Sequence, residues 1–75
     1  MGRGEIDLLM RHDGFPVAVE VKSRVAAEPL GEFTAEKRDA VAAAARRLRP
    51  PVRRIDLVTV RFGRSGALIR WLRGV

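Results

Sequence analysis

The sequence predicts an α/β fold in which a β-hairpin is followed by a crossover helix and then by two further strands of the same mixed sheet. Three features predict it: a turn-forming dipeptide between two alternating segments, an alanine-rich segment with a helical apolar stripe, and a segment rich in β-branched residues. The chain has 75 residues and no cysteine, so we expect residues 1-75 to form one small domain without disulfides.

The turn-forming dipeptide is Asp13-Gly14, whose two positions accept the positive φ that a two-residue hairpin turn needs. With this turn, the segments on either side pair in one register, and successive side chains alternate between two faces. One face is apolar and contains the pairs Ile6 with Val21, Leu8 with Val19, and Met10 with Val17. The other face carries Glu5, Asp7, Glu20 and Lys22. The hairpin therefore gathers its charged side chains on one side.

On this charged face, the predicted register sets Asp7 directly opposite Glu20, with Cβ atoms about 4.5–5.5 Å apart. Opposed like charges destabilise a sheet, so the pair requires a shared proton or a bridging cation. Mg²⁺, or Mn²⁺ in its place, suits such a site, because one or two carboxylates commonly hold Mg²⁺ together with waters and phosphate oxygens. Lys22 lies next along the same face and can meet a phosphate. We predict a phosphodiester-processing site; the plainer alternative is a solvated strand face.

The helix is predicted from Ala35 to about Leu48, after an irregular segment, 23–33, that contains Pro and Gly. Thr34 is the expected N-cap, and Pro50-Pro51 ends the helix. Its apolar stripe consists of Val41, Ala44, Ala45 and Leu48. Lys37 continues this stripe toward the amino end, where it points to the acidic cluster or a phosphate, or merely extends its stem past the sheet edge.

The second half of the sheet is predicted from segment 55–62, which is apolar on both faces and suits an interior strand beside segment 17–22. A turn over residues 63–66 leads to a last strand from Ala67 to about Leu72. We expect Trp71 in this strand to be a packing residue. The single histidine, His12, is interpreted as a solvated turn residue.

The charge of the chain indicates a polyanionic partner. Fifteen Lys and Arg residues against nine Asp and Glu give a net charge of +6, and thirteen of the fifteen are arginines, whose planar fork suits phosphate. Nucleic acid is the expected partner, with DNA favoured over RNA, although an arginine-rich genome also explains the choice of cation. The contact candidates are Arg3, Arg24, Arg46 and Arg47. No apolar run approaches the ~20 residues of a membrane span, and a cytoplasmic location is expected.

Several motifs resemble those of one known family: Gly4-Glu5-Ile6-Asp7-Leu8, Val19-Glu20-Val21-Lys22-Ser23-Arg24, Gly31, Lys37 and Arg54-Ile55-Asp56-Leu57-Val58. In order and spacing they are similar to the YraN-type uncharacterised protein family of the restriction-endonuclease-like (PD-(D/E)xK) superfamily. This resemblance implies a restriction-endonuclease-like core that binds a divalent metal and cuts nucleic acid, as archaeal Holliday-junction resolvases do. Asp7 and Glu20 would be the metal ligands and Lys22 the catalytic lysine, with Glu5 and Lys37 as further site candidates.

One departure from that family concerns the amino-terminal end. Family members carry a helix and a strand before the Gly-Glu-Ile-Asp-Leu motif, so the resemblance predicts an N-terminally shortened domain that lacks both. Its first strand would be an exposed edge, which invites a homodimer or another partner that covers the sheet. The leading functional reading is a nucleic-acid-binding, Mg²⁺-dependent endonuclease. The alternatives are an inactive nucleic-acid-binding module and a structural or interaction protein that keeps the fold.

Overall fold

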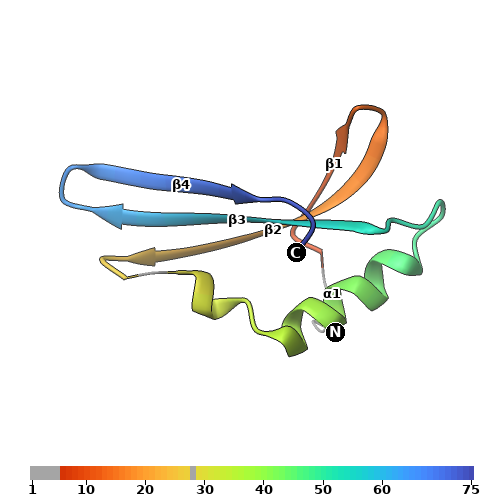
Figure 1. The fold of residues 1–75 in the computed structure, drawn as a ribbon, viewed down its shortest axis with the longest axis horizontal. Coiled ribbons are helices and arrows are strands. Elements are labelled where there is room, and N and C mark those ends of the chain that lie inside the picture. The colour runs from red at the N-terminus through yellow and green to blue at the C-terminus, as the bar shows by residue number, and fades with distance from the viewer. Residues whose placement is uncertain (1–5, 28) are drawn as a thin grey trace.

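The computed structural model describes residues 6–27 and 29–75. Its elements are β1 (Leu8–His12), β2 (Phe15–Val25), a short 3₁₀ helix η1 (Pro29–Glu32), α1 (Ala35–Arg46), β3 (Arg54–Gly63) and β4 (Gly66–Leu72). The four strands form one sheet in the order β1-β2-β3-β4, in which only β2 and β3 are parallel, and α1 covers one of its faces (Figure 1). The predicted α/β fold with a hairpin, a crossover helix and two further strands is confirmed.

The hairpin has the predicted register, which runs from Leu8 opposite Val19 to His12 opposite Phe15. Its turn places Asp13 at φ 54° and Gly14 at φ 84°, as a two-residue turn between right-twisted strands requires. The register therefore follows from the turn dipeptide alone.

The amino end of the hairpin differs from the prediction. The ladder stops at Leu8, so Asp7 is not a strand partner of Glu20, and Ile6 does not face Val21. Ile6 instead packs against the apolar cluster beneath α1. The ladder ends here because the Asp7 main chain and carboxylate bond to the Glu20 side chain and the Val21 N–H instead of to a strand.

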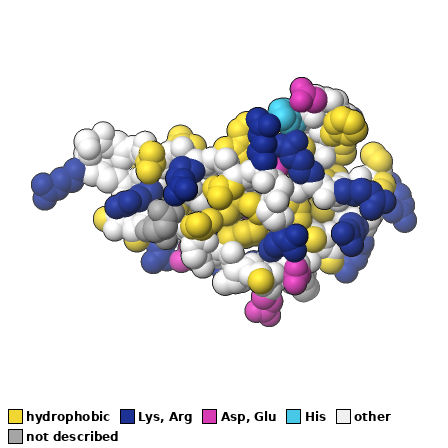
Figure 2. All heavy atoms as spheres, in the orientation of Figure 1, with side chains coloured by type: hydrophobic (Ala, Val, Ile, Leu, Met, Phe, Trp, Pro, Cys, Tyr) yellow, Lys and Arg dark blue, Asp and Glu magenta, His cyan; other side chains and the backbone are white. Residues whose placement is uncertain are grey.

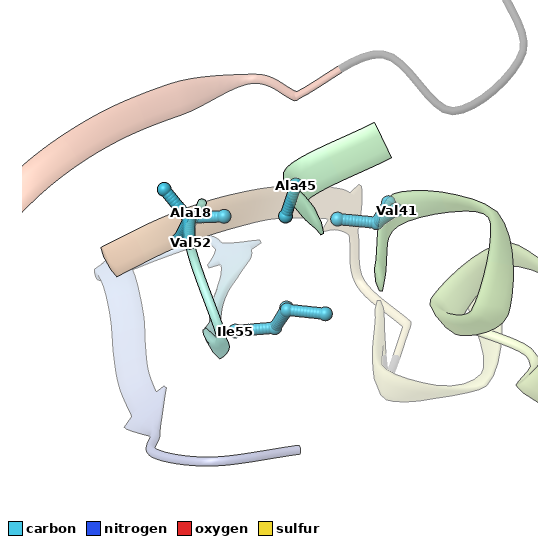
Figure 3. Close-up of a cluster of buried hydrophobic side chains, with 5 residues drawn as sticks. All are labelled: Ala18, Val41, Ala45, Val52 and Ile55. Carbon is cyan, nitrogen blue, oxygen red and sulfur yellow. The ribbon is translucent and has the colours of Figure 1, made fainter. Parts of the chain in front are cut away.

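The core lies between α1 and the sheet. Val41 and Ala45 of α1 meet Ala18 of β2 and Ile55 of β3, and Val52 closes the cluster (Figure 3). These two helix residues belong to the predicted stripe, and the small alanines allow α1 to approach the strands closely. The predicted N-cap is confirmed by the bond that Thr34 Oγ1 accepts from the Lys37 N–H at 3.2 Å, and the helix ends at Arg46, slightly before the predicted end.

Strand β2 is longer than the sequence indicated. The segment predicted as a loop, 23–33, begins with three residues that continue the parallel pairing with β3 as far as Val25 opposite Phe62. The strand ends where Ala26 takes φ 54° and donates its N–H to the Phe62 carbonyl at 2.7 Å. The long, β-branched β3 offers a partner over this whole length, which outweighs the weak local pattern of residues 23–25.

In the part of the chain that the structure describes, no helix covers the sheet face opposite α1, although Val17, Val19 and Asp56 on this face are buried. Five of its large apolar side chains are 41% to 65% exposed: Leu8, Met10, Val21, Ile69 and Trp71. We call this set the open face. Apolar patches of this kind mark interaction surfaces. As to membranes, neither helix among the described residues combines the length and apolar character that a bilayer crossing demands.

Self-association remains a prediction. The strands β1 and β4 lie at the two edges of the sheet, and an unpaired strand edge offers its main-chain groups to a second copy. Multi-angle light scattering at micromolar concentrations is expected to give a mass above that of a monomer. A constant monomer mass of 8.3 kDa over the concentration series would contradict this expectation.

Candidate metal and phosphate site

Asp7 and Glu20 are joined by two reciprocal hydrogen bonds across the end of the hairpin. The Asp7 N–H donates to Glu20 Oε2 at 3.1 Å, and the N–H of Val21, the residue after Glu20, donates to Asp7 Oδ2 at 3.0 Å. Each carboxylate therefore caps the main chain of the other strand at the point where the ladder stops. The predicted proximity of the two acids is present, although it arises from side-chain bonds and not from a strand pair.

The two carboxylates have different surroundings. Glu20 is only 3% exposed, whereas Asp7 is exposed to solvent. Burial raises the pKa of Glu20, and the negative charge and side chain of Asp7 raise it further. The hydrogen bond from the Asp7 N–H and the charge of Lys22 oppose this rise without cancelling it. Additional positive charge next to Glu20 would therefore favour its ionised form.

Lys22 lies two residues beyond Glu20 on β2, so strand alternation places both side chains on the face that α1 covers. In the register of the parallel pair it lies beside Thr59 of β3, and it is half-buried. A lysine, a buried carboxylate and an exposed carboxylate thus share one region of the sheet.

The donor set fits a hard divalent cation. The second oxygens of the two acids, Glu20 Oε1 and Asp7 Oδ1, accept no hydrogen bond from residues 6–27 and 29–75. Within those same residues, no group of three or more acidic or histidine side chains could hold a metal. Mg²⁺ is commonly held by one or two carboxylates with waters and phosphate oxygens completing its shell, so two acids suffice.

The other predicted site residues are distributed more widely. Lys37 is exposed in the first turn of α1 and has no bond to either acid, among the residues described. Arg24 continues the face of Lys22 but is held by Glu32 at 2.8 Å. Arg46 and Arg47 are exposed at the carboxyl end of α1. The candidates Arg3 and Glu5 lie outside the described residues.

The opposite face of the sheet carries a polar cluster that the sequence did not reveal, centred on Asp56. This residue has 0% exposure, and four bonds reach its carboxylate. They are Arg54 Nε to Oδ1 at 2.9 Å, Arg54 Nη2 to Oδ2 at 2.8 Å, Trp71 Nε1 to Oδ2 at 2.9 Å, and the Gly74 N–H to Oδ1 at 3.0 Å. Burial alone raises the pKa of Asp56, but these donors and the Arg54 charge outweigh it and lower the pKa.

His12 belongs to this Asp56 cluster, so its interpretation as a solvated turn residue is wrong. It ends β1, and its Nδ1 accepts a bond from Arg54 Nη1 at 2.9 Å, because a guanidinium can only donate. Its ring also meets Trp71 edge-on, at 5.9 Å between centroids. The only sequence signal was the Arg54-x-Asp56 spacing, which sets both residues on one strand face. The cluster ties β1, β3, β4 and the carboxyl-terminal residues together.

Comparison with known proteins adds one finding. The model of the Uncharacterised protein family UPF0102 matches residues 1–60, a segment that includes Asp7, Glu20 and Lys22. Neither the curated proteins nor the solved structures gave a match. The match agrees with the resemblance to the YraN-type family, and it spans well over half of the chain. The protein therefore belongs to the Uncharacterised protein family UPF0102.

Proposed function

We propose that the protein binds nucleic acid and hydrolyses its phosphodiester bonds with a divalent cation, Mg²⁺ or Mn²⁺, held by Asp7 and Glu20. The observation that carries the proposal is the reciprocal bonding of these two acids, one of them buried with a raised pKa, beside Lys22. A cation resolves the repulsion between the acids, and the strongly basic surface attracts the polyanion that brings a phosphate to it.

The residues of the chain have separate tasks in this proposal. Asp7 and Glu20 would hold the cation, which would supply acidification of a water and compensation of charge on the attacked phosphate. The main-chain bonds from Asp7 and Val21 fix one oxygen of each acid and so orient the other oxygen for the cation. The ammonium of Lys22 is available to orient the attacking water or to contact a phosphate oxygen.

A second candidate is a nucleic-acid-binding module that does not cleave. The observation that favours it is the size of the acidic set, because the described part of the chain contributes two carboxylates here and no third acid or histidine. In this candidate, the arginines bind the backbone and the acids serve as a cap at the end of the hairpin. A cleavage assay on duplex, single-stranded and branched DNA with Mg²⁺ or Mn²⁺ separates the two functions.

Metal binding tests the acid pair directly. Isothermal titration of Mg²⁺ and Mn²⁺ into the wild type is expected to give saturable heat, and Asp7→Asn is expected to remove it because the exposed ligand loses its charge. Asp13→Asn is the matched control, since this exposed aspartate in the hairpin turn lies away from Glu20. Equal heats in the wild type and Asp7→Asn would eliminate the metal site.

Cleavage tests the role of Lys22. Lys22→Gln is expected to retain the metal heat and to reduce metal-dependent cleavage by about a hundredfold or more, because it removes a charge near the reacting phosphate without removing a ligand. Lys37→Gln, which alters the other lysine of the chain at an exposed position, should leave cleavage within a few-fold of the wild type. If Lys22→Gln cleaves at the wild-type rate, Lys22 is not a catalytic lysine.

A further inference from the structure

A groove between α1 and the start of β3 is lined by four arginines. Arg38 and Arg46 come from one flank of α1, and Arg53 and Arg54 come from the start of β3 and the residue before it. The main chain at Gly74 and Val75 forms another side, and the volume is about 280 Å³. The lining arginines of α1 are eight residues apart with Ala42 between them, which is the spacing of one helix flank.

Two of the four arginines are already neutralised, and two are available. Arg38 bonds Asp39 at 3.1 Å, and Arg54 is held by Asp56. Arg46 and Arg53 have no hydrogen bond or ion pair from their side chains to any residue in 6–27 or 29–75. The Gly74 and Val75 N–H groups are used by the Asp56 carboxylate and the Ile55 carbonyl. Among the described residues, the guanidinium groups in the groove that lack a carboxylate partner are therefore those of Arg46 and Arg53.

The surroundings of the groove are strongly basic. Residues 38–54 contain six arginines and one aspartate, and Figure 2 shows Lys and Arg side chains gathered at the end of the molecule where α1 leads into β3. Two unpaired guanidinium groups within one groove suit an oxyanion with several acceptor oxygens, and each can bind it bidentately. The concentration of charge around them suits an anion that continues beyond the groove.

We propose that this arginine groove binds a backbone phosphate of DNA through Arg46 and Arg53. The acid pair comes from the β1 and β2 side of the sheet, whereas the groove lies where α1 meets β3 and the last residues of the chain, so the two are separate contact points. The proposal rests on the proposed function in that both contacts serve one nucleic acid. It also distinguishes Arg46 from the neighbouring Arg47, which does not line the groove.

The test compares two double variants that remove the same charge from the same end of the molecule. Arg46→Gln with Arg53→Gln alters the groove, and Arg47→Gln with Arg49→Gln is the matched control. Binding of a short fluorescein-labelled DNA duplex is measured by anisotropy in EDTA across a salt series, which keeps the acid pair free of metal. All four positions carry exposed side chains outside the strands, and circular dichroism checks that each variant is folded.

The groove variant is expected to bind DNA about tenfold more weakly than the control variant. The negative slope of its log affinity against log salt should become shallower than that of the wild type by about one for each arginine removed. Equal losses of DNA affinity in the two double variants would overturn the proposal that the groove binds phosphate, while leaving the proposed function intact. Absence of duplex binding by the wild type at low salt would overturn both.

Discussion

Replacing Asp56 with alanine is expected to lower the free energy of unfolding by about 3 kcal/mol. The carboxylate accepts bonds from Trp71, from the Gly74 N–H and from Arg54, and it has 0% exposure. Alanine removes every acceptor and leaves these donors without partners beneath the open face. A domain of this size has little stability in reserve, so the loss is a large fraction of the total.

Urea unfolding followed by circular dichroism measures this loss. The control is Asp39→Ala, which breaks the exposed pair with Arg38 and should change the free energy of unfolding by less than about 1 kcal/mol. Because the folded-state pKa of Asp56 is lowered, its contribution is present above the unfolded-state pKa and is lost as pH falls through the folded-state pKa. The wild type and Asp56→Asn should therefore converge in acid. An unchanged urea midpoint for Asp56→Ala would show that the cluster contributes nothing to folding.

Replacing Glu20 with glutamine is expected to change the response of the protein to both pH and metal. The pKa of Glu20 is raised in the folded state, so the folded protein retains a proton that the unfolded chain releases. As pH rises from the unfolded-state pKa through the folded-state pKa, the wild type should lose stability relative to Glu20→Gln. Glutamine keeps an oxygen that accepts the Asp7 N–H, so the variant should fold.

Metal should reverse this order. At a Mg²⁺ concentration about a hundred times its dissociation constant, the wild type gains about 2.7 kcal/mol, and Glu20→Gln should gain none. Thermal unfolding across a pH series, in EDTA and in Mg²⁺, measures both effects. Glu36→Gln, at an exposed position in the first turn of α1, is the control and should follow the wild type. Parallel pH profiles for the wild type and Glu20→Gln would contradict a raised pKa at this site.

The sequence predicted those features that depend on local chemistry. Asp13-Gly14 determined the hairpin turn and its register, and Thr34 determined the start of α1. The proximity of Asp7 to Glu20 was predicted from the same register, although it arises from side-chain hydrogen bonds and not from a strand pair. The alternation within β2 also placed Lys22 on the face of Glu20.

Features that depend on distant residues could not be predicted. The contact between His12 and Arg54 joins positions 42 residues apart, and nothing near His12 in the sequence indicates it. The ladder stops at Leu8 because two carboxylates compete with the strand for main-chain N–H groups. The register set by the turn does not predict this competition. The length of β2 depended on its partner β3, not on the weak pattern of its own last residues.

Because of the open face, dissolved salt is expected to have two opposite effects on the interactions of this protein. Added ions screen the mutual repulsion of molecules that each carry +6, and so favour contact through Leu8, Met10 and Ile69. The same ions weaken the hold of arginine on phosphate. In the proposed function, a long DNA strand would neutralise the protein locally without that penalty. Protein molecules bound along one strand would then lie within reach of each other, and contacts between their open faces would make binding cooperative.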